Sequence, residues 1–308
     1  MPLEAACPTL SITPKSPEPV GLLAGSGRFP VLFADKARLL GIPIVCVGIR
    51  HHADPCLQRY CWRFYWAGVT RLGRIVRCFR REGVTKIVMA GKIAKTVMFT
   101  PWRVLTLLPD WRGVRFWLRR RRRDNRDDSL LLDVIEEFAS EGMVFASALE
   151  VCPELLASPG LLSLRAPTAS QWEDIRFGWT MAKELGRLDI GQSVVVKERA
   201  VLAVEAIEGT DRCILRAGEL CPAGGFSLIK VSKPHQDMRF DVPTIGPQTV
   251  RSMHHAGGRV IAIEAYKTII VDQAETIQLA NQWNISIVSL IRPETLNDKT
   301  GYLFDLRS

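Results

Sequence analysis

The stretch VGLLAGSG, residues 20–27, decides how the first half of this chain folds. Its first five residues form an apolar run that breaks into a glycine-rich turn, and residues 30–40 then carry apolar side chains at helical spacing. A short apolar run of this kind indicates a buried strand. The stretch therefore predicts a strand that passes through a tight turn into a helix.

The same alternation continues along the chain. Residues 42–48 and 86–91 predict two more buried strands, and residues 69–82 predict a helix between them. Another helix is predicted through residues 127–139, because acids occupy its first turn and Gly142 follows its end. Alternating strands and helices are typical of a parallel sheet with helices on both faces, so we expect an α/β fold.

The length of 308 residues and the hydrophobic content of 47% favour two domains. We expect a disordered leader at residues 1–19, an N-terminal domain over 20–160 and a distinct α/β domain over 161–308, with the linker near 158–170. In the second domain the sequence predicts a helix at 172–185 and strands at 193–196, 200–206, 226–231, 260–263, 269–271 and 285–290.

The charge and the cysteines narrow the functional classes. A net charge of +9 and a pI near 9.3 favour an acidic partner, which could be nucleic acid, anionic lipid or a phosphorylated ligand. The apolar runs are too short to cross a bilayer and the first twenty residues lack a signal-peptide pattern, so we expect a cytoplasmic protein. The eight cysteines form no CxxC pair, and we expect free thiols at Cys7, Cys46, Cys56, Cys61, Cys78, Cys152, Cys213 and Cys221.

Residues 111–125 mix aromatic rings with a basic block, Arg119 to Arg123. A solvated surface is the commonest explanation of such a run. Contact with an anionic membrane comes second, because arginines meet lipid phosphates while Trp and Phe enter the interface. No motif supports binding of nucleic acid.

The turn Gly25-Ser26-Gly27 admits two interpretations. Its backbone N–H groups lie before a helix, where a phosphate can bind, or it is only a tight turn. The third glycine of a dinucleotide fingerprint is replaced by Pro30, and no ribose-binding acid ends the second strand. NAD is therefore not favoured.

Three acids, Glu205, Glu208 and Asp211, crowd a predicted strand end and a glycine turn. Oxygen ligands at this density suit Mg²⁺, which takes one or two carboxylates and completes its shell with water and substrate phosphate. Thr210 and the backbone of Gly209 could also hold a phosphate oxygen. The alternative is an ordinary acidic hairpin turn.

Lysines and a further acid follow this segment. Lys230 and Lys233 lie at the end of another predicted strand, and Asp241 lies soon after in the sequence RFDVPTIG. Lysines neutralise phosphate charge, and a buried carboxylate beside a metal can bind the ion or orient water. Because His254-His255 lacks a HExxH context and no catalytic triad is evident, phosphoryl chemistry is favoured over a zinc site or an acyl transfer.

Five segments together resemble one known family: GLLAGSGRFP (21–30), DDSLL (127–131), GRLDIGQSVVV (186–196), VLAVEAIEGTD (201–211) and KPHQDMRFDVPTIGPQTV (233–250). They occur in the order found in the UDP-2,3-diacylglucosamine pyrophosphatases of the LpxI type. The resemblance covers almost the whole chain after residue 20.

The resemblance implies hydrolysis of UDP-2,3-diacylglucosamine to UMP and 2,3-diacylglucosamine 1-phosphate, called lipid X, in lipid A biosynthesis. It implies attack by water at the α-phosphorus and Mg²⁺ as the cofactor. It also implies a Rossmann-like N-terminal domain, a distinct C-terminal domain with the lipid product held between the two, and a homodimer.

The resemblance also implies site residues. Asp241 falls at the family's essential aspartate, and we expect it to hold Mg²⁺ or position the attacking water. Thr210 and Asp211 are the next catalytic candidates. The candidate substrate contacts are Gly25, Ser26, Gly27, Gln192, Lys230, Lys233 and Asp128, and the candidate metal ligands beside Asp241 are Glu205 and Glu208.

Two features depart from the family, namely the first twenty residues and the basic block at Arg119 to Arg123, which could strengthen docking on the inner membrane. A different class of function also remains open, a non-catalytic sensor of nucleotide sugars or lipid phosphates. The four acids argue against it, because a mere binder of anions gains little from carboxylates.

Overall fold

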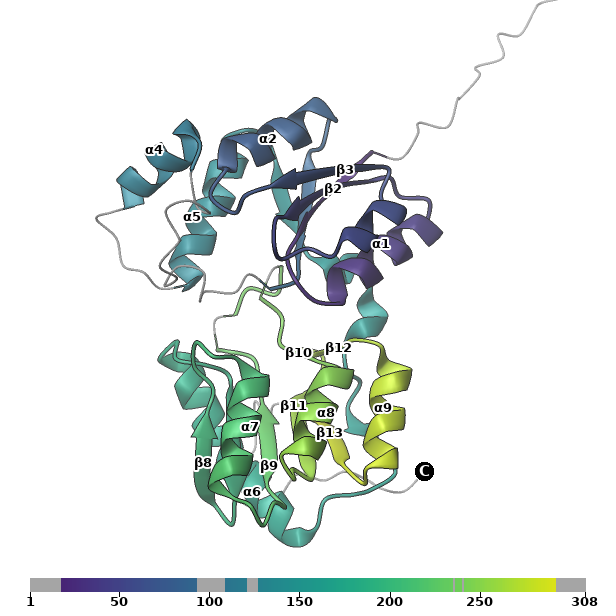
Figure 1. Ribbon diagram of the computed structural model, residues 1–308, viewed down its shortest axis with the longest axis vertical. Coiled ribbons are helices and arrows are strands. Elements are labelled where there is room, and N and C mark those ends of the chain that lie inside the picture. Colours follow the sequence, from purple (N-terminus) through teal and green to yellow (C-terminus); the bar gives the residue numbers. More distant parts are fainter. Residues whose placement is uncertain (1–17, 93–108, 121–126, 235, 240, 292–308) are drawn as a thin grey trace, which may run out of the picture.

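The computed structural model describes residues 18–92, 109–120, 127–234, 236–239 and 241–291. Figure 1 shows two α/β units arranged one above the other along the long axis, the N-terminal unit above and the C-terminal unit below. Residues 1–17 of the expected leader and the side chains of residues 119–123 lie outside the described part. In that part no helix has both the length and the apolar character needed to span a bilayer.

The N-terminal unit is built on a five-stranded parallel sheet in the order β3-β2-β1-β4-β5. The predicted parallel sheet is therefore confirmed. Its strands are β1 (Val20–Ala24), β2 (Ile44–Ile49), β3 (Arg63–Ala67), β4 (Lys86–Ala90) and β5 (Val144–Ala146).

Helices cover both faces of this sheet, so its central strands are apolar along their whole length. One face packs against α1 (Phe29–Leu39) around Phe33, and the other packs against α2 (Leu72–Arg81), α4 (Trp111–Arg120) and α5 (Asp127–Ala139) around Phe79 and Phe138. Short 3-10 helices, η1 (Pro55–Arg59), η3 (Ala148–Glu150) and η4 (Pro153–Leu155), complete the unit. The burial of both faces explains the continuous apolar runs in the sequence.

The C-terminal unit contains a mixed six-stranded sheet in the order β6-β13-β11-β9-β7-β8. Its three central strands, β13, β11 and β9, are parallel to one another, whereas β7, β8 and β6 are antiparallel to their neighbours. The strands are β6 (Gly160–Leu161), β7 (Ser193–Lys197), β8 (Ala200–Val204), β9 (Ser227–Lys230), β11 (Val260–Glu264) and β13 (Ser286–Leu290). A separate parallel pair joins β10 (Thr244–Ile245) to β12 (Ile269–Ile270).

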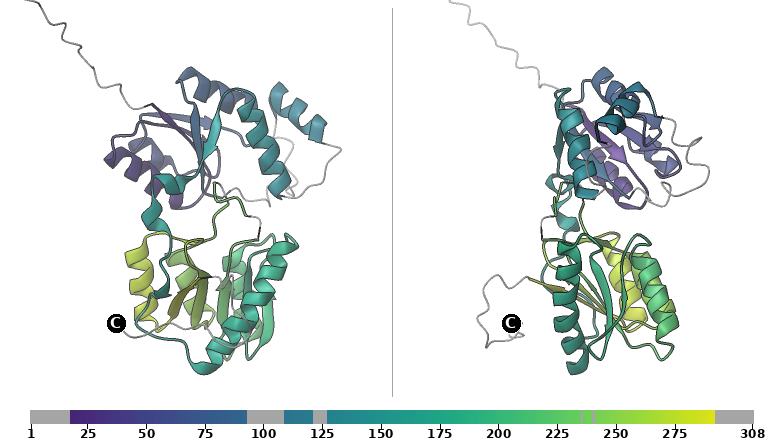
Figure 2. Two further views of the ribbon diagram at one scale, coloured as in Figure 1. Left: turned by 180° about the vertical axis from the view of Figure 1, so that it is seen from behind. Right: turned by 90° about the vertical axis from the view of Figure 1, so that its left-hand side faces the viewer.

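Helices divide unevenly between the two faces of the C-terminal sheet. The helix α6 (Ala169–Arg187) packs on one face, while α7 (Thr210–Leu220), α8 (Pro247–His255) and α9 (Gln273–Gln282) pack on the other, as the right-hand view of Figure 2 shows. A Thr168 and Gln171 capping box begins α6, which satisfies backbone N–H groups at that end. The two faces form separate apolar cores.

The structure corrects the sequence prediction at the acidic segment. Residues 205–211 do not form a hairpin turn, because the chain passes from β8 directly into α7, which begins at Thr210. The interpretation as an acidic hairpin turn was wrong. It failed because the apolar side chains of α7 are few, with Cys213, Ile214 and Ala217 forming its buried face.

Several contacts join the two units. The chain leaves η4 and forms a bridge between Leu156 and Ile269 of β12. The Ser147 hydroxyl donates to the carbonyl oxygen of Met238 at 3.0 Å, and Arg28 pairs with Asp272 at 3.2 Å. The described residues between β9 and β10 (231–234, 236–239 and 241–243) belong to the loop that rises from the C-terminal unit toward the N-terminal one in Figure 1.

Candidate active site

A chain of three buried side chains lies at the carboxyl end of strand β9. Lys230 ends that strand with only 2% of its surface exposed, and its Nζ donates to Thr210 Oγ1 at 2.6 Å. Thr210 begins α7, and its hydroxyl donates onward to Glu205 Oε1 at 2.8 Å. Residues from β9, from the start of α7 and from the end of β8 therefore meet at one point.

The charges of Lys230 and Glu205 affect each other's pKa. Burial lowers the pKa of Lys230, although the charge of Glu205 opposes the shift. Burial alone would raise the pKa of Glu205, but the Lys230 charge and the hydrogen bond from Thr210 outweigh it, and that pKa is lowered. The Ser193 hydroxyl is near enough to the carboxylate to help lower its pKa, but its geometry falls short of a hydrogen bond, and Glu205 Oε2 is buried without a partner within the described residues.

Two further acids surround Lys230. Asp211 and Asp241 both act on its charge and raise its pKa against the effect of burial. Asp211 lies in the first turn of α7 and accepts a 3.3 Å hydrogen bond from the Ser252 hydroxyl of α8. Asp241 lies in the loop after β9, and its backbone N–H donates to the carbonyl oxygen of Asp237 at 3.1 Å. The structure thus brings together five candidates from three stretches of the sequence, namely Glu205, Thr210 and Asp211 from the first, Lys230 from the second and Asp241 from the third.

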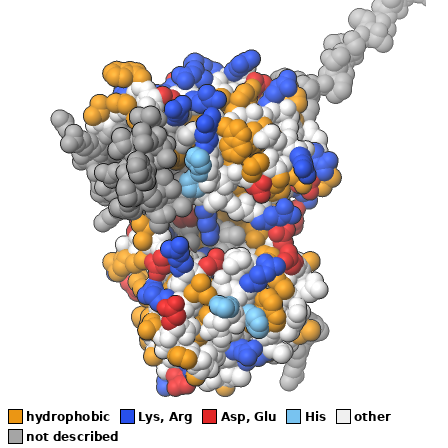
Figure 3. Space-filling model, viewed as in Figure 1, with side chains coloured by type: hydrophobic (Ala, Val, Ile, Leu, Met, Phe, Trp, Pro, Cys, Tyr) orange, Lys and Arg blue, Asp and Glu red, His pale blue; other side chains and the backbone are white. Residues whose placement is uncertain are grey.

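The N-terminal unit contributes a lysine that the sequence analysis did not identify. Lys92 follows β4, and its charge lowers the pKa values of both Glu205 and Lys230. It therefore lies close to the buried chain from the opposite unit. Figure 3 shows basic side chains on both sides of the waist between the two units.

The glycine turn after β1 holds the backbone of Lys92. The Ser26 N–H donates to the Lys92 carbonyl oxygen at 2.8 Å, the Lys92 N–H donates to the Ser26 carbonyl oxygen at 2.9 Å, and the Ser26 hydroxyl adds a third bond of 2.8 Å. A Cβ atom at Gly25 would lie 2.6 Å from the Lys92 carbonyl oxygen, so only glycine permits this approach. Gly27 has a φ of +101°, which also favours glycine.

Other predicted site residues have partners elsewhere. Glu208 accepts from Arg216 at 2.6 Å, Lys233 pairs with Asp189 at 2.5 Å, and Gln192 accepts from Gln236 at 3.2 Å. Asp128 lies in α5, but its side chain is outside the described residues. In the described ranges no three His, Cys, Asp or Glu side chains converge as a metal-binding group.

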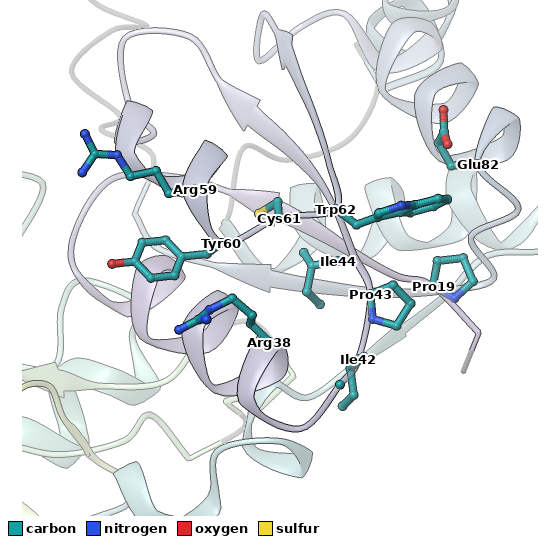
Figure 4. A pocket seen from close by; sticks show the side chains of 11 residues that line it. Pro19, Arg38, Ile42, Pro43, Ile44, Arg59, Tyr60, Cys61, Trp62 and Glu82 are labelled. Atoms are coloured by element: carbon teal, nitrogen blue, oxygen red, sulfur yellow. The ribbon is translucent and has the colours of Figure 1, made fainter. Parts of the chain in front are cut away.

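A surface pocket of about 710 Å³ lies away from this cluster. It opens where β1, β2 and β3 begin, and Arg38, Tyr60, Trp62 and Pro43 line it (Figure 4). The cluster instead lies beyond the carboxyl ends of strands, which is where open α/β sheets bind ligands. The pocket is therefore a separate feature of the N-terminal unit.

The fold and the cluster define a two-domain α/β protein with lysines and carboxylates gathered where the domains face each other. Two family models match it, described as the LpxI N-terminal domain over residues 19–155 and the LpxI C-terminal domain over residues 158–288. The chain belongs to the LpxI family, as its sequence motifs predicted.

A curated relative has the same organisation over nearly its full length. The UDP-2,3-diacylglucosamine pyrophosphatase LpxI of Caulobacter vibrioides is 34% identical over 281 residues, which cover 88% of this chain and 97% of the relative. Among solved structures, the biotin carboxylase domain of Hydrogenobacter thermophilus 2-oxoglutarate carboxylase matches with a TM-score of 0.25 and 13% identity. That match spans 68% of this chain and 42% of the other, and a likeness this distant informs neither fold nor function.

Proposed function

We propose that this protein hydrolyses UDP-2,3-diacylglucosamine to UMP and 2,3-diacylglucosamine 1-phosphate, with water attacking the α-phosphorus. The observation that carries the proposal is the 34% identity to the Caulobacter pyrophosphatase over 97% of its length. The cluster around Lys230 supports it, because cations stabilise charge that develops on a transferring phosphoryl group. The strand order β3-β2-β1-β4-β5 also supports a Rossmann-like N-terminal domain.

The residues of the cluster have distinct roles in this proposal. Lys230 and Lys92 face one site from the two domains and bind the diphosphate of the substrate. Glu205 keeps Lys230 protonated through its charge, and Thr210 links the two side chains by hydrogen bonds. Asp241 orients the attacking water, and Asp211 supports it from the start of α7.

The donor set also fits Mg²⁺. This ion takes one or two carboxylates and draws its other ligands from water and substrate phosphates, and Asp211 and Asp241 are two carboxylates beside the same lysine. Glu205 offers its unpaired Oε2, whereas the Glu208 carboxylate is already neutralised by Arg216. When bound, the ion would neutralise charge on the phosphate oxygens.

Contact with the inner membrane is part of the same proposal, because the substrate carries acyl chains. Helix α4 exposes Trp111, Arg115 and Leu118 along one stripe, and the exposed fractions of Trp111 and Leu118 are 81% and 61%. An aromatic, basic and aliphatic stripe of this kind suits an anionic interface. We expect a homodimer on the cytoplasmic face, which light scattering and fractionation would test.

The test of the reaction is a mass measurement. Purified protein is incubated with UDP-2,3-diacylglucosamine and Mg²⁺ in ¹⁸O-labelled water, and label in UMP is the expected result. Label in the lipid product would overturn attack at the α-phosphorus. Tight binding without cleavage would replace the enzyme with a sensor of nucleotide sugars.

The test of Asp241 is the substitution Asp241→Asn, with Asp35→Asn as a matched control. Asp35 lies on α1 and pairs with the neighbouring Arg38, away from the cluster. We expect Asp241→Asn to keep its fold and lower kcat by about 100-fold or more, as the loss of a group that acts on the reacting atoms does. Near-normal turnover of Asp241→Asn would contradict its role.

A further inference from the structure

Behind the cluster lies a second buried ionic group that the reaction does not use. Glu264 ends strand β11 with 0% of its surface exposed. Its Oε2 accepts three hydrogen bonds, from the Ser232 N–H at 2.9 Å, from the Ser232 hydroxyl at 2.7 Å and from Lys183 Nζ at 2.5 Å. Its other oxygen, Oε1, lies 3.4 Å from Lys267 Nζ and has no hydrogen-bond partner among the described residues, so Ser232 and Lys183 supply the hydrogen bonds of this buried carboxylate.

Lys183 also binds Ser232 directly. It reaches across from α6, and its Nζ also donates to the Ser232 carbonyl oxygen at 2.8 Å. The N–H, the hydroxyl and the carbonyl oxygen of Ser232 are therefore all bound by the Lys183 and Glu264 pair. These residues are far apart in the sequence, so the arrangement depends on the sheet and on α6 together.

The position of Ser232 makes its hydrogen bonds to Lys183 and Glu264 relevant to the reaction. Ser232 lies two residues after Lys230, near the start of the loop that carries Asp241. The residues on either side of it are also tied, because the Val231 N–H donates to the Gln192 carbonyl oxygen at 3.0 Å and the Lys233 N–H donates to Gln236 Oε1 at 2.8 Å. Ser232 is thus the point where the strand that carries Lys230 meets the loop that carries Asp241.

Stability alone is a poor reason for such a pair, because two buried charges lose much of their attraction to desolvation. Burial raises the pKa of Glu264, but the hydrogen bonds from Lys183 and Ser232 outweigh burial and the pKa is lowered, so the carboxylate is ionised at neutral pH. Hydrogen bonds to an ionised acceptor are the stronger kind, and the bond from Lys183 Nζ joins two opposite charges.

We propose that Lys183 and Glu264 form a positioning pair, which fixes Ser232 so that Lys230 and Asp241 stay aligned on the substrate diphosphate. This inference rests on the proposed function, since it assigns a role within that same site. Neither residue touches the substrate. They act through the backbone of Ser232.

The first test compares kinetics of Glu264→Gln and Lys183→Met with a matched control, Ser163→Ala. Ser163 is also buried, and its Oγ accepts from the Ile287 N–H at 2.8 Å near the opposite end of the same sheet. We expect Glu264→Gln to lower kcat by about 10- to 100-fold with KM nearly unchanged, as a small misplacement of a reacting group does. The control should lose stability and keep kcat.

The double variant Lys183→Met with Glu264→Gln provides a further check. Because both residues act on Ser232, its loss of kcat should be no larger than that of Glu264→Gln, and additive losses would show independent roles. If all variants, including Ser163→Ala, lose kcat only in proportion to their unfolded fraction, the positioning role is overturned.

Hydrogen exchange separates this inference from the proposed function. In the peptide covering residues 231–241, Glu264→Gln should speed amide exchange by about tenfold, while Ser163→Ala should leave it unchanged. Unchanged exchange in Glu264→Gln overturns the positioning pair whatever the activity. If Glu264→Gln exchanges faster but the wild-type protein does not cleave the substrate, the positioning of the loop by Lys183 and Glu264 is supported and the proposed reaction is rejected.

Discussion

Replacing Lys230 by Met is the substitution that most directly probes the buried chain. Met has a similar length and no charge, so the change removes the cation while keeping most of the packing volume. It leaves the Glu205 carboxylate buried, with Oε2 unpaired and the Thr210 hydroxyl without its donor. The variant therefore contains an uncompensated buried charge.

The cost follows from that charge. Removing one partner of a buried ionic pair costs about 3–5 kcal/mol, because the remaining charge keeps its desolvation penalty. For a unit of this size, such a loss corresponds to a decrease in Tm of about 10–20 °C. Adding Glu205→Gln removes the charge and keeps an acceptor for Thr210, so the double variant should regain most of the lost stability.

The pH dependence has a definite sign. In the wild-type protein the pKa of Glu205 is lowered, so its contribution is present above the unfolded pKa and is lost as pH falls through the folded value. In Lys230→Met the largest effect that lowers the pKa of Glu205 is gone. Burial then outweighs the smaller effects of Thr210 and Lys92, and this pKa should rise above its unfolded value. Its charge then costs stability as pH rises, and the variant should recover stability on acidification from pH 7 to about pH 5.

Urea denaturation of the three proteins at several pH values measures these effects. The reasoning would be refuted if Lys230→Met lost less than about 1 kcal/mol, the value of an ordinary exposed pair. A double variant as unstable as the single one would refute it as well, because the buried charge would then not be the cause.

Three further predictions concern other parts of the chain. Gly25→Ala should lower Tm and activity, at a cost of about 1–3 kcal/mol, because the new Cβ would lie 2.6 Å from the Lys92 carbonyl oxygen; unchanged melting would show that the turn can open. Asp272→Asn removes the partner of the half-exposed Arg28 and should change the free energy of unfolding by at most about 1 kcal/mol in urea titrations. Burial raises the pKa of Cys213 to about 12, so this thiol should resist alkylation at pH 8 in mass-spectrometric mapping, and rapid labelling would contradict its burial.

Several strands and the family could be predicted from the sequence because they depend on residues that are neighbours along the chain. Apolar runs bounded by glycine predicted β1, β2 and β4, and the motif segments identified the family. The short strands β3 and β5 and the helices α8 and α9 were not predicted. The strands are apolar but very short, with sequences RFYWA and VFA, whereas polar residues interrupt the apolar pattern of the two helices, so packing against the sheet decides all four.

The candidate site likewise contains residues that the sequence could identify and residues that it could not. Glu205, Thr210, Lys230 and Asp241 belong to polar segments that end apolar runs, and that local pattern was enough to select them. Glu208 follows the same pattern, yet Arg216, in the second turn of α7, neutralises it. The sequence alone could not separate Glu208 from Glu205, because the helix that carries Arg216 was not anticipated.

By itself the sequence determined the alternation of strands and helices, the family and most of the acids and lysines, because hydrophobic periodicity and motif spacing are local properties of the chain. Only the tertiary structure decided which side chains meet. Lys92 approaches Glu205 from another domain, and Lys183, Ser232 and Glu264 converge from α6, from the loop after β9 and from β11. Such contacts depend on strand order and on the packing of helices across a sheet, which no short stretch of sequence encodes.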